Sequence, residues 1–214
     1  MESEILDNLA KAVKEFSADD AAKWARKAME EKLDALKAMD ALTGAIREIG
    51  DDFARGECFL PELLGAADAM QGAMPILEED LNRRSLKRES AGIVVAGTVA
   101  GDIHNIGKSI LCTLLKADGF EVVDLGIDVS VESFLTATKQ HKPQVIAMSA
   151  LLTITAAEQK KVIQALEKEG IRRGIKIIVG GAAISEQFAD SIGADGYDST
   201  ALGGVKLARS LLAA

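Results

Sequence analysis

The second half of the chain alternates short β-branched apolar runs with segments of helical periodicity. This alternation predicts a parallel sheet covered by helices on both faces. Five runs in one wound layer favour a Rossmann-like (flavodoxin-like) α/β domain with a five-stranded parallel sheet over residues 92–214. We expect strands at Ile93–Val99, Glu121–Leu125, Gln144–Met148, Lys176–Val179 and Gly196–Tyr197, with helices at about 107–118, 131–140, 155–170, 184–191 and 200–213.

Residues 1–84 follow a different pattern, in which Ala, Leu, Glu and Lys dominate and apolar positions recur at helical spacing. We expect helices at about 2–16, 18–36, 37–56 and 60–82. The boundary between the second and third stays open, because the residues around it break no rule of helix propensity. The pattern predicts an all-α four-helix bundle. The charged segment 85–91 is interpreted as an interdomain linker.

Charge and cysteine content exclude several classes of protein. The net charge of −8 argues against a nucleic-acid or anionic-membrane surface. Neither a signal peptide nor an apolar run of transmembrane length is visible. Cys58 and Cys112 form no C-x-x-C pair and suit a reducing interior. We therefore expect a cytoplasmic protein with no nucleic-acid or membrane partner.

The most informative loop is 97–108, which follows the first predicted strand. Open α/β sheets bind their ligands at the carboxyl ends of strands. This loop places His104, one of two histidines in the chain, two residues after Asp102 and three before Gly107. An imidazole can act as a neutral nitrogen ligand near neutral pH, and a ligating histidine usually donates its other N–H to a carboxylate.

Each of these features also has a purely structural interpretation. His104 can cap the following helix, and the loop glycines can serve simple turns. The hydroxyls of Ser149 and Thr153 can cap the helix near residue 155. Apolar residues at helical spacing, among them Met70, are usually bundle core.

Taken together, four elements in this order resemble corrinoid methyl-carrier proteins of multi-component methyltransferase systems, which are similar to the cobalamin-binding module of methionine synthase. The first is the Asp-x-His-x-x-Gly loop of residues 102–107. The second is the Ser-x-Leu-x-Thr element of residues 149–153. A glycine pair at 180–181 and the segment 195–197 leading to Ala201 complete the match. The first half of the chain resembles the helical cap of this family.

The resemblance implies cobalamin or a related corrinoid, in its methylcobalamin form, as the cofactor. His104 would be the axial ligand of cobalt, with Asp102 and Thr155 as a relay behind it. Ser149, Thr153 and the glycine pair would line a slot for the nucleotide tail, whose bulk excludes side chains there. Phe53, Leu60 and Met70 would cover the methyl group. The implied cofactor-binding residues are Gly101, Asp102, Ile103, His104, Asn105, Ile106, Gly107, Ser149, Leu151, Thr153, Gly180, Gly181, Ala201, Phe53, Leu60 and Met70.

The implied function is to carry a methyl group on base-off, His-on cobalamin through a Co(I)/methyl-Co(III) cycle. The implied partners are a substrate-specific methyltransferase, an acceptor methyltransferase that uses tetrahydrofolate or a thiol coenzyme, and a reductive activation protein. The carrier has no catalytic residues of its own. The methyl donor stays open among methylamines, methanol, glycine betaine and methoxylated aromatics.

Three other functions remain as alternatives. A cobalamin-sensing regulator would pair the same cap and domain with a DNA-binding head, and no helix-turn-helix precedes the cap here. A mutase cobalamin subunit would usually lack this cap. A non-corrinoid flavodoxin-like signalling domain would not explain the Ser149 and Gly180 elements together.

Overall fold

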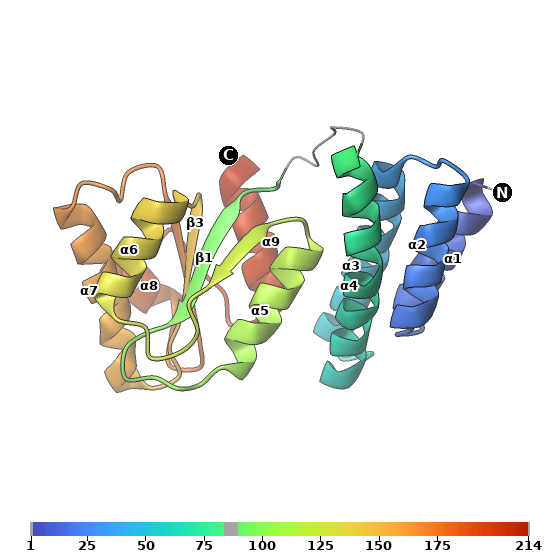
Figure 1. Cartoon of the computed structure of the whole chain (residues 1–214). Coiled ribbons are helices and arrows are strands. Elements are labelled where there is room, and N and C mark those ends of the chain that lie inside the picture. Colours follow the sequence, from blue (N-terminus) through green and yellow to red (C-terminus); the bar gives the residue numbers. More distant parts are fainter. Residues whose placement is uncertain (1, 84–89, 214) are drawn as a thin grey trace. The chain divides into compact units, whose positions relative to one another are not determined.

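The computed structural model describes residues 2–83 and 90–213 (Figure 1). The chain divides into two compact units, residues 1–89 and 90–214. Most of the expected linker, 85–91, lies outside the described residues. Among the helices that are described, none has the length and apolar character needed to cross a membrane.

The first unit is the predicted four-helix bundle. It consists of α1 (Glu2–Lys14), α2 (Ala18–Glu30), α3 (Ala35–Arg55) and α4 (Leu60–Arg83). Apolar positions spaced three or four residues apart turn one side of each helix inward. The largest fully buried side chains of this core are Ile5, Leu9, Met39, Leu42, Leu63 and Leu77.

The predicted end of the second helix is wrong, because α2 ends at Glu30 and does not continue to residue 36. Lys32 adopts a left-handed backbone with φ 57°, which the right-handed helix does not allow. Asp34 then caps α3, and its carboxylate accepts the backbone N–H of Leu36 at 3.0 Å. The capping side chain therefore sets a boundary that helix propensity leaves open.

The second unit is the predicted α/β fold. Its strands are β1 (Ile93–Thr98), β2 (Glu121–Asp124), β3 (Val145–Ser149), β4 (Lys176–Gly180) and β5 (Gly196–Tyr197). They form one parallel sheet in the order β2-β1-β3-β4-β5, which is the flavodoxin-like order. The helices are α5 (Ile106–Ala117), α6 (Val131–His141), α7 (Thr153–Lys168), α8 (Glu186–Ile192) and α9 (Ala201–Ala213). Strands and helices lie within two residues of the expected ends.

Helices cover both faces of the sheet. Helices α5 and α9 pack together on one face, and α6, α7 and α8 pack in sequence on the other (Figure 1). The core on the second face contains Phe134, Ile146 and Ile163, all fully buried. A Cβ on Gly97 would approach the ring of Phe134 to 2.7 Å, so this strand position has no room for a side chain.

The register of the sheet brings three loops to one edge. Thr98, Ser149 and Gly180, each the last residue of its strand, are neighbours across β1, β3 and β4. The connections from β1 and β3 leave toward opposite faces, which makes this edge a topological switch point. The sequence elements singled out above therefore meet at a position where α/β sheets bind ligands.

Candidate functional site

The loop between β1 and α5 holds His104 at the carboxyl edge of the sheet. The Thr98 hydroxyl donates to the His104 carbonyl at 3.0 Å and ties the loop back to the strand. A second segment supports the loop from the side. The Gly101 N–H donates to the Asp128 carboxylate at 2.7 Å, and the Asp128 N–H donates to the Asp102 carbonyl at 3.0 Å. The backbone that carries His104 is thus fixed from two directions.

Asp102 is 1% exposed, and each of its carboxylate oxygens accepts two hydrogen bonds. Oδ1 accepts the backbone N–H of His104 at 3.0 Å and faces the ring nitrogen Nδ1 at 2.8 Å. Oδ2 accepts the Leu151 N–H at 2.8 Å and the Thr155 hydroxyl at 2.6 Å. The expected hydrogen bonds from His104 and Thr155 to Asp102 are therefore present, and Leu151 adds one that the sequence did not indicate.

These bonds determine which nitrogen of His104 is free. A carboxylate only accepts hydrogen bonds, so Nδ1 carries the proton and Nε2 keeps its lone pair. The His104 side chain is 48% exposed, whereas Asp102 behind it is buried. The site thus presents one oriented ring nitrogen, Nε2, on the exposed side of the imidazole.

Opposing effects act on the pKa of Asp102. Desolvation by burial is the largest single effect and raises it. Hydrogen bonds from the Thr155 hydroxyl, from the His104 and Leu151 N–H groups and from the imidazole together lower it by more. The net result is a pKa well below the ordinary aspartate range, so Asp102 stays ionised and keeps the proton of His104 on Nδ1.

Neither His104 nor the β3–α7 hydroxyls act as helix caps. Asn105 is the N-cap of α5 and Leu152 is the N-cap of α7, and neither makes a side-chain capping bond. The capping interpretations of His104, Ser149 and Thr153 are therefore not supported.

Large apolar side chains are exposed in the two loops that Asp102 joins. Ile103 and Ile106 flank His104 and are 71% and 72% exposed. Leu151, Leu152 and Ile154 are also exposed beyond the end of β3. Exposed apolar side chains gathered around a polar group are typical of a surface that an apolar ligand covers.

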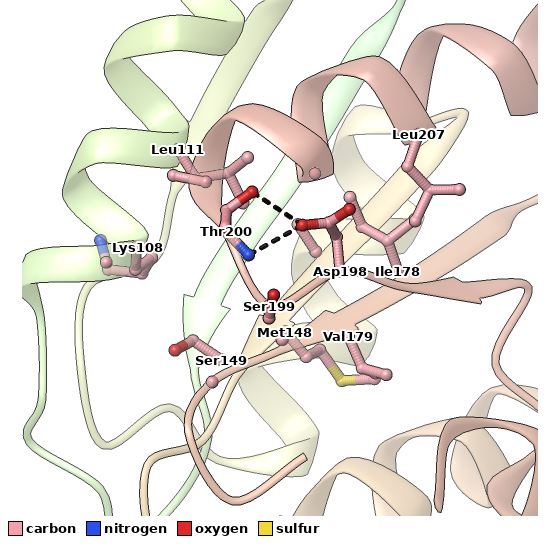
Figure 2. Close-up of a pocket in the computed structure, with 16 residues that line it drawn as sticks. Lys108, Leu111, Met148, Ser149, Ile178, Val179, Asp198, Ser199, Thr200 and Leu207 are labelled. Carbon is pink, nitrogen blue, oxygen red and sulfur yellow. Dashed lines mark hydrogen bonds between the residues drawn. The ribbon is translucent and has the colours of Figure 1, made fainter. Parts of the chain in front are cut away.

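A cavity of about 110 Å³ opens among β3, β4, α5 and α9 (Figure 2). Of the residues predicted in this region, Gly107, Ser149, Gly180, Gly181 and Ala201 line it. Leu151 and Thr153 are not among its lining residues. Figure 2 shows Lys108 and Leu111 of α5 across from Ile178, Asp198 and Leu207. The lining residues that the sequence analysis missed are Lys108, Leu111, Ala147, Met148, Ile178, Val179, Asp198, Ser199, Thr200, Gly204 and Leu207.

A Cβ added at each of three glycines that line this cavity would meet different surroundings. A Cβ on Gly181, which has φ 121°, would lie 1.9 Å from the Ala150 carbonyl oxygen. A Cβ on Gly180 would lie 3.1 Å from the Asp198 carbonyl oxygen. The chain itself thus disfavours side chains at both positions, and exclusion by a nucleotide tail stays a prediction. A Cβ on Gly107, by contrast, would meet nothing within 4 Å, so Gly107 leaves open space beside the cavity.

Lys108 is buried and forms an ion pair with Asp124. Only 2% of its side chain is exposed, and its Nζ lies 2.6 Å from Oδ2 of Asp124 at the end of β2. Desolvation by burial raises the pKa of Asp124, but the hydrogen bonds from Lys108 and from the Gly126 N–H lower it below its usual value. The ammonium group is thus held toward β2, while Lys108 forms part of the cavity wall.

The remaining predicted site residues belong to the helical unit. Phe53 and Leu60 are partly exposed, near the end of α3 and at the start of α4. Met70 is 2% exposed and packs within the bundle. Their contact with a corrinoid stays a prediction.

The described residues contain no group of three or more His, Cys, Asp or Glu side chains arranged to hold a metal ion.

Comparison with known proteins gives matches over both units. Residues 92–206 and residues 5–78 each match a family described as a B12 binding domain. Trimethylamine corrinoid protein 1 of Methanosarcina acetivorans is 39% identical over 98% of this chain and 97% of its own length.

Two solved structures are similar as well. A methanol:cobalamin methyltransferase complex from Methanosarcina barkeri contains a chain with TM-score 0.89 and 32% identity, over 100% of this chain and 81% of that one. A cobalamin-binding protein from Desulfitobacterium hafniense matches with TM-score 0.77 and 32% identity, over 96% of this chain and 97% of its own.

Proposed function

The chain belongs to the B12-binding corrinoid proteins of methyltransferase systems, and from this premise we propose that it carries a methyl group on the cobalt of a corrinoid bound through His104. The methyl group comes from a substrate-specific methyltransferase. It is then transferred to tetrahydrofolate or a thiol coenzyme by an acceptor methyltransferase. A reductive activation protein returns oxidised carrier to the cycle.

The observation that carries this proposal is the oriented imidazole beside a cavity. Nε2 of His104 is free to bind a metal, because Asp102 holds the proton on Nδ1. The open space at Gly107 and the exposed side chains of Ile103 and Ile106 suit a broad apolar ring system next to that nitrogen. The cavity between α5 and α9 suits the nucleotide tail in the base-off form. The residues present therefore fit a corrinoid.

The protein's own residues would bind the corrinoid, orient the imidazole of His104 and hold its proton on Nδ1. The bound corrinoid supplies a cobalt atom that accepts a methyl group and gives it up. His104 offers its lone pair from one side, and Asp102 keeps the ring in one tautomer. The Thr155 hydroxyl satisfies the second oxygen of Asp102, so the carboxylate stays ionised and fixed.

We assign the choice of methyl donor to the partner enzyme. One similar protein is named for trimethylamine and another belongs to a methanol:cobalamin methyltransferase complex, yet both match nearly the whole of this chain. The groups gathered around His104 suit a corrinoid, and the two similar proteins share this chain's fold although their names refer to different donors. The same carrier surface therefore suits different donors.

The test is reconstitution with hydroxocobalamin followed by desalting and visible spectroscopy. Wild-type protein is expected to stay red, with the spectrum of cobalt ligated by imidazole in place of the nucleotide base. His104→Ala should change that spectrum and retain less corrinoid. His141→Ala is the matched control, since the other histidine lies at the end of α6. Colourless wild type, or equal spectra for the wild type and His104→Ala, would refute His104 as the ligand.

A further inference from the structure

A second hollow lies at the opposite edge of the sheet from His104. It is formed where α6 leads into β3 and where α7 leads into β4, which are the amino ends of those strands. Its volume is about 410 Å³, within the range of ligand and peptide sites. We name it the basic hollow; its lining residues are Thr138, Lys139, Lys142, Pro143, Ile171, Arg173, Gly174 and Ile175.

The charge of the basic hollow contrasts with that of the protein. The whole chain has a net charge of −8, yet three cations and no acidic residue line this hollow. Lys139 is partly neutralised, because its Nζ lies 2.7 Å from Glu169. Lys142 and Arg173 are exposed and have no ion-pair partner among the residues that the structure describes. Two free cations therefore remain at the rim.

The lining also includes apolar side chains. Pro143 is buried, and Ile171 and Ile175 are half-buried. A simple inorganic anion needs hydrogen-bond donors and gains nothing from apolar surface. A ligand with an apolar side chain between two carboxylates would pair with the two cations and pack against the apolar lining.

The walls of the basic hollow are held in place by hydrogen bonds. Arg172 donates to the Gly193 carbonyl at 3.1 Å and to Asp195 at 2.6 Å, which fixes the turn between α7 and β4. On the other side, the Lys142 N–H donates to the Thr138 carbonyl at 3.0 Å and closes the end of α6. A rigid hollow loses little conformational entropy on binding.

We propose that the basic hollow is a docking site for an acidic segment of a partner protein, in which an apolar residue lies between carboxylates. Its place at the amino edge of the sheet leaves the His104 edge free, so a partner can hold the carrier while the other edge is occupied. The proposal does not depend on corrinoid binding and is tested on the full chain without cofactor.

The experiment is an NMR titration of ¹⁵N-labelled protein with the peptide acetyl-Glu-Glu-Leu-Glu-Glu-amide. The largest amide shifts are expected at residues 138–142 and 171–175, and they should weaken at high salt. Lys142→Glu/Arg173→Glu should weaken binding about fivefold or more, since each exposed pair contributes modestly. The matched control, Lys160→Glu/Lys161→Glu, reverses the same charge on exposed α7 positions and should leave binding unchanged.

Other outcomes would overturn the proposal. Equal shifts with inorganic phosphate at the same concentration would indicate a simple anion site. Shifts outside the basic hollow, or equal weakening in both double variants, would indicate non-specific charge attraction. Equal binding of acetyl-Gln-Gln-Leu-Gln-Gln-amide would show that the cations do not select the ligand. All four substituted positions are exposed, and circular dichroism checks that both variants fold.

Discussion

At the scale of single residues, the site depends on one carboxylate. Asp102 is buried, and its two oxygens accept bonds from His104, Leu151 and Thr155. It thereby orients the imidazole and joins the loops after β1 and β3. Its role in the function and its role in stability are therefore coupled.

Asp102→Asn is expected to damage both properties. If the carbonyl of the new asparagine faces His104, its NH2 group faces the Leu151 N–H and the Thr155 hydroxyl. Two N–H donors then face each other, and a buried donor is left without an acceptor. We expect a loss of about 1–3 kcal/mol of unfolding free energy and of about 10–100-fold in cobalamin affinity. Urea unfolding and spectrophotometric titration measure these, with the exposed Asp190→Asn as control. Wild-type affinity in Asp102→Asn would contradict the orienting role.

The pH dependence of stability follows from the lowered pKa of Asp102. Its pKa in the folded state lies below the unfolded value of about 3.9. The carboxylate therefore contributes stability above that pH, and the contribution is lost as pH falls toward the folded-state pKa. Between about pH 5 and about pH 3, wild type should lose stability more steeply than Asp102→Asn. Urea midpoints across this range test it, and parallel curves would contradict it.

Two glycines at the cavity are expected to respond in opposite ways to alanine. Gly181→Ala forces a Cβ to 1.9 Å from a backbone oxygen at positive φ, so it should destabilise the cofactor-free protein. Gly107→Ala meets nothing within 4 Å and lies in α5, so it should leave stability equal or raise it by up to about 1 kcal/mol. Its cobalamin affinity should nevertheless fall. Thermal unfolding and cobalamin titration separate the effects, and unchanged affinity in Gly107→Ala would argue against a ligand there.

At the scale of elements, α5 connects the His104 loop with the cavity. Gly107, Lys108 and Leu111 all face the cavity from this helix. The ion pair of Lys108 with Asp124 also ties α5 to the end of β2. Removing either member of this ion pair would leave the other charge unpaired, which costs free energy. The pair therefore holds the helix against the sheet.

Lys108→Met is expected to discriminate between corrinoids with and without a nucleotide tail. Methionine keeps an unbranched side chain but cannot pair with Asp124, so the cavity wall should loosen. Cobalamin affinity should fall severalfold, while cobinamide, which has no tail, should bind as it does to wild type. Lys116→Met is the control, because Lys116 is exposed on the same helix. Equal losses for both corrinoids would place the effect outside the tail cavity.

Much of this arrangement was predictable from the sequence, and the reasons are specific. Strand ends in a parallel sheet share an edge, so the elements at His104, Ser149 and Gly180 had to meet. The contributions of Lys108 and Asp198 were not predictable, because facing a cavity depends on how α5 and α9 pack. The need for glycine at position 181 was also not predictable, since a Cβ there would clash with the Ala150 carbonyl of a different loop. The boundary between α2 and α3 depended on the left-handed backbone at Lys32 and on the cap of α3 at Asp34, which propensity does not reveal.

At the scale of the whole molecule, the two units have separate cores. The helical unit buries its apolar side chains among α1 to α4, and the α/β unit gathers the site at one sheet edge. The resemblance assigns Phe53, Leu60 and Met70 of the helical unit to the cover over the methyl group. This assignment predicts effects on the bound cofactor that differ from effects on folding.

Phe53→Ala and Met70→Ala are expected to separate these effects. Met70 is buried, so its truncation should cost about 2–5 kcal/mol of unfolding free energy with or without corrinoid. Phe53 is partly exposed and should cost less. If Phe53 covers the reduced cobalt, Phe53→Ala should speed oxidation of the reduced corrinoid protein in air-saturated buffer. Stopped-flow spectroscopy measures the rate, and an unchanged rate would contradict the covering role.

The most direct measurement of the central claim is electron paramagnetic resonance of the Co(II) form of the reconstituted protein. Protein labelled with ¹⁵N only in histidine is compared with unlabelled protein, both with unlabelled cobalamin. Ligation by His104 predicts that the nitrogen superhyperfine triplet becomes a doublet in the labelled protein, and that His104→Ala loses the doublet while His141→Ala keeps it. A triplet that persists after labelling would show that cobalt is bound by the corrinoid's own base and would contradict the account.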